Sequence, residues 1–321
     1  MCSNAVESEI DILDPTKFVD PEITAKGERR ASVALQRLDT LWFNTGTLCN
    51  LTCANCYIES SPTNDQLAYL STDEVRAYLD EVVDDGWPVR EIGLTGGEPF
   101  MNPEIIGIIE LSLNRGFKVL VLTNAMRPMM KLADPLNDLN RRLGERLTIR
   151  VSLDHYTQAC HEIERGQHSW EPTINGIRWL SDNGFTLNVA GRTYWNEPDI
   201  SLREGYATLF ATLGVGLNVS DHAELMLLPE MDERADVPEI TEACWDILGI
   251  NPASIMCASS RMVVKRKNVG VPTVLPCTLL PYDRQFEMGR TLADAATAVK
   301  LNHPHCAKFC VLGGGSCSVS D

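Results

Sequence analysis

Short apolar runs alternate with longer amphipathic segments through most of the chain. The apolar runs are rich in β-branched residues and predict strands over 41–44, 91–95, 117–123, 147–153, 185–192 and either 216–219 or 224–228. The segments between them have helical periodicity over 71–86, 103–115, 127–143 (broken by Pro135), 172–183 and 202–213. Strands that alternate with helices imply a parallel sheet. Six such strands without a dinucleotide-binding fingerprint predict an α/β fold of the open-barrel kind.

The two ends of the chain break this alternation. Residues 1–40 are rich in acidic residues and proline, and they predict an N-terminal arm with one short helix near 29–38. The last ninety residues are rich in cysteine, and 261–264 and 273–275 predict a β-hairpin around the turn Asn268-Val269-Gly270. We therefore expect an arm over 1–40, a barrel over 41–230 and a small hairpin-plus-helix extension over 231–321.

Composition and charge argue against several classes of partner. The 321 residues carry a formal net charge of −16, which argues against a nucleic-acid partner because phosphate binding needs a basic surface. The sequence has no run of eighteen apolar residues and no secretory signal, so we expect no membrane partner and a cytoplasmic location. Eleven cysteines in such a chain predict thiols that act as metal ligands in a reducing compartment.

Three of these cysteines form one compact group. Cys49, Cys53 and Cys56 are separated by three and then two residues, and thiolates are the soft ligands of iron–sulfur clusters. A [4Fe–4S] cluster takes four ligands, so three cysteines leave one iron open to a non-protein ligand. Zinc, or three buried cysteines without a metal, are the alternatives. A zinc site normally needs a fourth cysteine or histidine nearby. The next candidates along the chain are His155 and Cys160, about a hundred residues later.

The spacing C-x3-C-x2-C resembles the signature of the radical S-adenosylmethionine (SAM) enzymes. The resemblance implies a partial (β/α)6 barrel over about 41–228, with a [4Fe–4S] cluster whose open iron chelates the amino and carboxylate groups of SAM. The sequence departs from the family at one point. Asn55 stands before the third cysteine, where the family often has an aromatic residue, and Tyr57 follows instead.

In such barrels the chemistry lies at the carboxyl ends of the strands. The second strand ends in Gly96-Gly97-Glu98, where paired glycines let a ligand approach the backbone and a carboxylate can pair with an ammonium group. These residues resemble the family's GGE motif, which implies binding of the SAM amino group. Later strand ends offer further candidates, which are otherwise ordinary strand-end polar residues. For the SAM ribose and carboxylate they are Asn124, Ser152 and Arg192, and for proton transfer they are Asp154 and His155.

A second cysteine group lies in the C-terminal quarter. Cys257 and Cys277 flank the predicted hairpin, which brings its two ends together, and Cys306, Cys310 and Cys317 follow. This arrangement resembles the Twitch or SPASM extension of radical SAM enzymes, which implies one auxiliary [4Fe–4S] cluster. The set we favour is Cys257 and Cys277 with two of the three later cysteines. A zinc site made of His303, His305, Cys306 and Cys310 is the alternative.

The resemblance also implies an activity. The family cleaves SAM reductively to a 5′-deoxyadenosyl radical, which abstracts hydrogen from a substrate. The nearest functions are oxidation or crosslinking of a small molecule or peptide, with a reducing partner such as flavodoxin or ferredoxin. The auxiliary cluster would then accept an electron from the product radical or ligate the substrate. The alternative from another class is an iron–sulfur electron carrier or redox sensor, which has no use for an open iron beside a GGE motif.

Overall fold

The structure is a computed structural model, and it describes residues 11–193, 195, 197–229 and 232–316. Its main element is an eight-stranded sheet with the order β7-β6-β5-β4-β3-β2-β8-β9, and all neighbours are parallel except β8 and β9. The strands are β2 (Thr40–Asn44), β3 (Glu91–Thr95), β4 (Lys118–Thr123), β5 (Leu147–Ser152), β6 (Thr186–Arg192), β7 (Leu225–Leu228), β8 (Ser260–Val264) and β9 (Thr273–Leu275). The six predicted parallel strands are confirmed, and the sixth is the later of its two alternatives.

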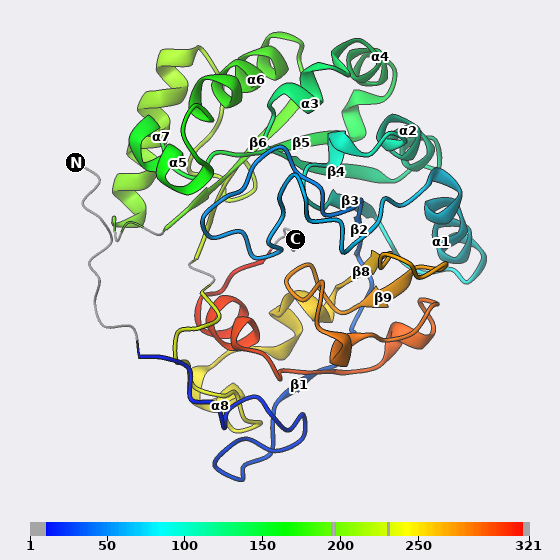
Figure 1. Ribbon diagram of the computed structural model, residues 1–321, viewed down its shortest axis with the longest axis vertical. Coiled ribbons are helices and arrows are strands. Elements are labelled where there is room, and N and C mark those ends of the chain that lie inside the picture. Colours follow the sequence, from blue (N-terminus) through cyan, green and yellow to red (C-terminus); the bar gives the residue numbers. More distant parts are fainter. Residues whose placement is uncertain (1–10, 194, 196, 230–231, 317–321) are drawn as a thin grey trace.

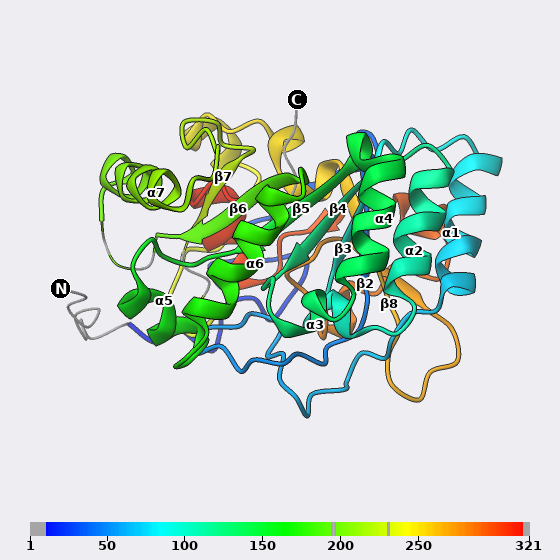
Figure 2. The same ribbon diagram turned by 90° about the horizontal axis from the view of Figure 1, so that it is seen from above.

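Helices connect the parallel strands and form an outer arc in Figure 1, and several of them lie side by side in the view of Figure 2. They are α1 (Thr72–Asp84), α2 (Ile105–Asn114), α3 (Arg127–Met130), α4 (Ala133–Leu143), α5 (Gln158–Arg165), α6 (Trp170–Asp182) and α7 (Asp199–Leu213). The start of α1 has a capping box, in which Ser71 and Glu74 each bond the other's backbone N–H. Pro135 does not break its helix. It lies in the first turn of α4, where no N–H is needed, and the break comes before it, at 131–132.

The sheet separates two hydrophobic cores. Leu41 and Phe43 of β2 join the core on the helical face, whereas Trp42 between them joins a second core with Met262 of β8. Because side chains alternate across a strand, one short run supplies both cores. The C-terminal segments lie on the side of the sheet opposite the helical arc (Figure 1). The described chain therefore has the layered form of a partial barrel of parallel strands and helices.

The C-terminal segments contain mostly short elements. They are α8 (Cys244–Leu248), β10 (Val299–Lys300), a π-helix (Cys306–Leu312) and the 3-10 helices Pro252–Ser254, Met256–Ala258, Arg284–Phe286 and Asp294–Ala296. Two more 3-10 helices lie in the barrel, at Pro99–Met101 and Gly144–Arg146. The predicted hairpin exists as β8 and β9, and β8 pairs with β2, so it extends the main sheet. No helix among the described residues has both the length and the apolar character that a bilayer crossing requires.

The N-terminal arm packs against these C-terminal segments. Residues 29–38, where the sequence predicted a short helix, are extended instead, and β1 (Ser32–Val33) pairs antiparallel with β10. Arg30 is fully buried and forms an ion pair of 2.6 Å with Glu239. The helical prediction was wrong because the apolar residues of this segment contact a distant strand, which local periodicity does not reveal.

Candidate active site

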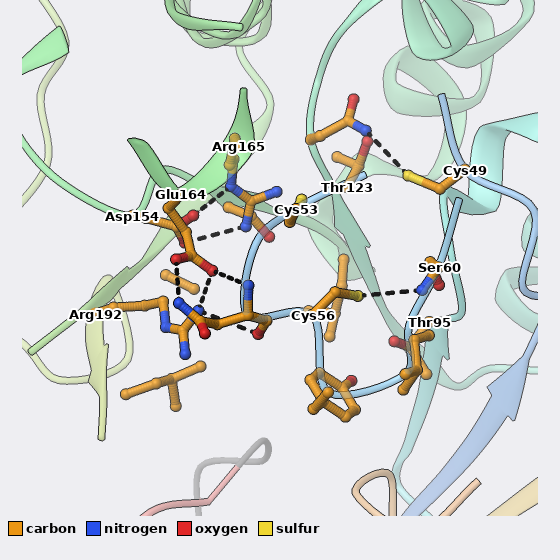
Figure 3. A pocket seen from close by; sticks show the side chains of 18 of the residues that line it. Cys49, Cys53, Cys56, Ser60, Thr95, Thr123, Asp154, Glu164, Arg165 and Arg192 are labelled. Carbon is orange, nitrogen blue, oxygen red and sulfur yellow. Dashed lines mark hydrogen bonds and ion pairs between the residues drawn. The ribbon is translucent and has the colours of Figure 1, made fainter. Parts of the chain in front are cut away.

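A pocket opens at the carboxyl ends of the parallel strands. The loop after β2 contributes Cys49, Cys53 and Cys56, and the far wall comes from β5, β6 and α5 (Figure 3). Six other predicted site residues share this lining: Gly96, Gly97, Asn124, Ser152, Asp154 and Arg192. The structure thus brings together residues that lie more than 140 positions apart in the sequence.

The paired glycines hold the cysteine loop against the loop after β3. Backbone N–H groups of Gly97 and Glu98 donate to the carbonyls of Gly46 and Leu48 at 2.8 and 3.0 Å. A Cβ atom on Gly96 would lie 2.4 Å from the Gly46 carbonyl oxygen, and one on Gly97 would lie 2.3 Å from that of Leu48. The glycines are therefore required by the contact between two loops of the protein, in addition to any contact with a ligand.

The cysteine sulfurs accept backbone hydrogen bonds. Leu51 N–H donates to Cys49 Sγ and Ser60 N–H donates to Cys56 Sγ, both at 3.4 Å. Burial raises the pKa of Cys49 to about 12 and that of Cys53 to about 11. Without a metal these thiols stay protonated at neutral pH, so metal binding must release their protons.

Glu98 is placed differently from the expectation. Its side chain is only 1% exposed, and its carboxylate accepts hydrogen bonds from Thr123 Oγ1 at 2.8 Å, Asn124 N–H at 2.9 Å and Phe100 N–H at 3.2 Å. Burial raises its pKa to about 7, although these three bonds lower it. Unlike its glycine neighbours, it does not line the pocket in the described part of the chain. Its described contacts join the ends of β3 and β4.

Asn124 connects this carboxylate to the cysteine loop. Its side-chain amide donates to Asn50 Oδ1 at 2.9 Å and approaches Cys49 Sγ at 3.9 Å, while its backbone N–H bonds Glu98. Asn124 is buried, so these bonds fix the amide in the pocket wall. Asn124 therefore contacts a predicted cluster ligand as well as the predicted SAM site.

Helix α5, which the sequence analysis did not predict, closes the other side of the cysteine loop. The buried carboxylate of Glu164 accepts hydrogen bonds from the Asn55 N–H at 3.1 Å and the Asn55 side-chain amide at 2.8 Å, and it pairs with Arg192 at 2.5 Å. The Glu164 carbonyl accepts the Ala54 N–H at 2.7 Å. We call Asn55, Glu164 and Arg192 the loop clamp. Its local signals were Thr157 before and Gly166 after an eight-residue helical segment.

The two candidates for proton transfer have different surroundings. Asp154 lines the pocket and forms a two-pronged ion pair with Arg165, with distances of 2.6 and 3.1 Å. Burial acts to raise the pKa of Asp154, but the charge and hydrogen bonds of Arg165, together with the charges of Arg192 and His161, hold that pKa below its usual value. His155 is 1% exposed, outside the pocket lining, and its Nε2 lies 2.9 Å from Glu197 Oε1. In this arrangement Asp154 is the ion-pair partner of Arg165. His155 links the loop after β5 to the loop that contains Glu197.

His161, also on α5, is a buried histidine that should make the stability of the protein depend on pH. Its imidazole is fully buried and neither ring nitrogen has a hydrogen-bond partner in the described structure, so burial lowers its pKa to about 4. A depressed histidine pKa stabilises the fold above the unfolded value of about 6.5, and this contribution is lost as pH falls toward 4. We expect His161→Leu to reduce the loss of unfolding free energy between pH 7 and pH 5 by about 1–2 kcal/mol. Denaturant titrations of both proteins at the two pH values measure this difference, and equal losses would contradict it.

The second cysteine group lies in the core on the inner side of the sheet. Cys257, Cys277 and Cys306 are all buried members of this one core, and Cys310 follows one turn later on the π-helix. Burial raises the pKa of the Cys306 thiol well above its usual value, and its electrostatic interaction with Cys277 and Cys257 raises it further. Cys317 lies outside the described residues.

The alternative zinc ligands point elsewhere. The rings of His303 and His305 lie 4.8 Å apart, and their Nε2 atoms are 3.6 and 3.9 Å from Glu233 Oε2. In the described part of the chain no three cysteine, histidine, aspartate or glutamate side chains already converge on a single-ion site. The described residues thus preform no single-ion site, either for the zinc alternative or at the two cysteine groups.

Comparison with known proteins identifies the class. Residues 43–200 match the family model of the radical SAM superfamily. The subtilosin biosynthesis protein AlbA of Bacillus subtilis is 33% identical over 143 residues, or 44% of this chain and 30% of AlbA. Mycofactocin maturase MftC of Mycolicibacterium smegmatis is 23% identical over 172 residues, or 54% of this chain and 41% of MftC. The aligned part therefore spans less than half of either relative.

Solved structures agree on the fold. SuiB of Streptococcus suis bound to SAM has a TM-score of 0.57 at 10% identity and covers 79% of this chain and 63% of its own. The enzyme anSMEcpe with bound SAM has a TM-score of 0.54 at 14% identity, with coverages of 80% and 77%. The chain belongs to the radical SAM superfamily through its residues 43–200. Its fold is the mixed α/β architecture of a partial barrel that these neighbours share.

The superfamily uses a [4Fe–4S] cluster and SAM, and the residues present fit both. Three thiols line one pocket, and two of their sulfurs already accept the N–H bonds that support cluster thiolates. The same pocket is lined by apolar side chains such as Leu122 and Met226 and by a few polar groups, a lining that is typical of sites for small ligands.

Proposed function

We propose that this protein is a radical SAM enzyme that oxidises or crosslinks a peptide or small molecule. The observation that carries the proposal is that Cys49, Cys53 and Cys56 line one pocket with Gly96 and Gly97 and with polar strand ends. An electron carrier needs no such space beside its cluster. The match of residues 43–200 to the radical SAM family supports the same function.

The roles of the chain's own residues follow from this pocket. Cys49, Cys53 and Cys56 would hold the cluster, and Gly96 and Gly97 would present backbone to SAM. Asn124, Ser152 and Arg192 lie where they can orient the ribose and carboxylate. When bound, the cofactors would supply the chemistry: one electron from a flavodoxin- or ferredoxin-type partner splits SAM into methionine and a 5′-deoxyadenosyl radical, which takes a hydrogen atom from the substrate.

The C-terminal cysteines would hold one auxiliary [4Fe–4S] cluster. The hairpin β8–β9 brings Cys257 and Cys277 into one core with Cys306, and we propose these two with two of Cys306, Cys310 and Cys317 as ligands. The position of this group on the inner side of the sheet, where residues such as Leu279 and Phe309 also line the SAM pocket, supports a role close to the substrate.

Relatives include both substrate classes of the proposal, because AdoMet-dependent heme synthase and GTP 3',8-cyclase stand among them beside proteins of peptide maturation. AlbA is a bacteriocin biosynthesis protein, MftC is a maturase, and SuiB has been solved with its precursor peptide SuiA. Structural likeness extends to about 80% of this chain for SuiB, although sequence identity is only about 11%. We therefore propose that peptides and small molecules are tried side by side as substrates.

The test is formation of 5′-deoxyadenosine. Anaerobically reconstituted protein, reduced with dithionite and supplied with SAM, should release 5′-deoxyadenosine and methionine in equal amounts, and substrate should accelerate the release. Protein with a full iron complement that neither binds SAM in a titration nor cleaves it would overturn the proposal in favour of an electron carrier or redox sensor.

Replacement of Cys277 tests whether the hairpin holds an auxiliary cluster. We expect Cys277→Ala to lower the iron content by about four atoms per chain, because a [4Fe–4S] cluster that loses a ligand is poorly held. The first cluster should remain, so SAM binding should persist. Iron and sulfide analysis of the reconstituted variant measures the loss, and unchanged iron would leave the hairpin without a ligand role.

A further inference from the structure

Arg261 of β8 is a buried cation that has no carboxylate partner among the residues the structure describes. Its side chain is 1% exposed, and its guanidinium donates only to backbone carbonyls. The acceptors are Cys257 at 2.6 Å, Ser260 at 2.7 Å, Ala295 at 2.8 Å and Thr297 at 3.1 Å. These bonds satisfy the donors but leave the net charge uncompensated.

Two other buried arginines of the described chain have carboxylate partners. Arg30 pairs with Glu239 and Arg192 pairs with Glu164, so these two buried positive charges each meet a negative one. Placing an ion in the protein interior without a counter-charge costs several kcal/mol. The arrangement around Arg261 therefore calls for a negative group that the carboxylates of the described chain do not provide.

The groups next to Arg261 that can carry negative charge are cysteines. Its Nη1 bonds the carbonyl of Cys257 itself, and Cys257 and Cys277 both interact electrostatically with the guanidinium. Burial lowers the pKa of Arg261, and the two thiolates would raise it. Four thiolates around a [4Fe–4S]²⁺ core give a net charge of about −2, which falls to about −3 on one-electron reduction. A fixed cation beside such a centre stabilises the reduced form more than the oxidised form.

We infer that Arg261 is the resident counter-charge of the auxiliary cluster and raises its reduction potential. This inference rests on the proposed auxiliary cluster and deepens it. It assigns Arg261 a role as a positioning and tuning residue, which acts on the cluster through charge and through the Cys257 carbonyl. The merely structural alternative is that Arg261 only ties the segment 295–297 to β8.

The test is a potentiometric titration of the reconstituted holoenzyme, followed by electron paramagnetic resonance. Arg261→Met removes the charge at similar volume, and Arg261→Lys restores it. We expect the Met variant to show at least a tenfold lower ratio of reduced to oxidised auxiliary cluster at a fixed potential, a shift of about 59 mV for one electron. The Lys variant should recover most of this shift, and the potential of the first cluster should not move. Arg30→Met, which removes a buried arginine that has its own carboxylate, is the matched control.

The outcomes distinguish a failure of the role inferred for Arg261 from a failure of the proposed auxiliary cluster. An unshifted auxiliary potential in a Met variant that retains both clusters would overturn the role of Arg261, as would equal shifts in the Met and Lys variants. Wild-type protein that binds only about four iron atoms per chain would instead remove the auxiliary cluster itself. If Arg261→Met does not fold, Arg261→Gln keeps hydrogen-bond donors without charge and is read in the same way.

Discussion

Replacing Cys53 with alanine should abolish 5′-deoxyadenosine formation. Cys53 is the middle of three thiols in the pocket, and a cluster already one protein ligand short cannot lose another and still offer a defined open iron. We expect activity below detection and a loss of about four iron atoms per chain. The iron of the C-terminal cysteines should stay, because that group belongs to a separate core.

The matched control is Cys244→Ala. Cys244 is a half-buried free thiol at the start of α8 whose sulfur contacts Thr241 and is not among the proposed ligands, so its loss should change neither the iron content nor the rate. The measurements are iron analysis and chromatographic detection of 5′-deoxyadenosine. A Cys53→Ala protein that still cleaves SAM at the wild-type rate would remove the first loop from the mechanism.

Replacing Glu164 with alanine should have the largest effect among the residues that hold no metal. The carboxylate is 2% exposed, and its loss leaves the buried Arg192 without this partner and Asn55 without two acceptors. Removing one member of a buried ion pair typically costs about 3–5 kcal/mol. Because the loop clamp holds the residue directly before Cys56, we also expect the first cluster to be lost faster to a chelator.

Glu164→Gln separates the two effects, since it keeps an oxygen for the Asn55 N–H but loses the charge facing Arg192. Glu171→Ala, an exposed glutamate in the first turn of α6, is the control. Denaturant unfolding and the rate of iron release to a chelator are the two measurements. If Glu164→Ala unfolds and releases iron as the wild type does, the clamp has no role in holding the loop.

Much of the barrel could be predicted because its signals are local. Runs such as Lys118–Thr123 are apolar over a strand's length, and the helices between them begin and end at recognisable residues such as Ser71 and Gly116. The cysteine spacing indicated the family, and the alternation of strands and helices indicated a parallel sheet. These features depend on neighbours within a few residues, which a single sequence displays directly.

The loop clamp could not be predicted in the same way. Glu164 bonds Asn55 across 109 positions, and its negative charge is typical of a solvent-facing helix end until its burial is known. Likewise the sequence suggested that Gly96 and Gly97 admit a ligand, whereas the structure shows that they also admit the loop of Gly46. Asn55 had been noted only as a departure from the family, and its side chain has its own partner in Glu164.

The pairing of β8 with β2 was missed for a related reason. Turn residues revealed the hairpin, but no local signal states which strand its free edge will join. In the structure Thr40 pairs with Ser260. This pairing makes the hairpin between Cys257 and Cys277 continuous with the sheet whose strand ends line the pocket.

That pairing also has a consequence for biosynthesis. While the ribosome is still making the middle of the chain, β2 has β3 on one edge and nothing on the other, because β8 follows 220 residues later. An unpaired strand edge can recruit a strand from another chain. Nascent protein should therefore be most prone to aggregate just before residue 264 emerges, and chains interrupted near residue 250 should need chaperones more than the complete sequence does.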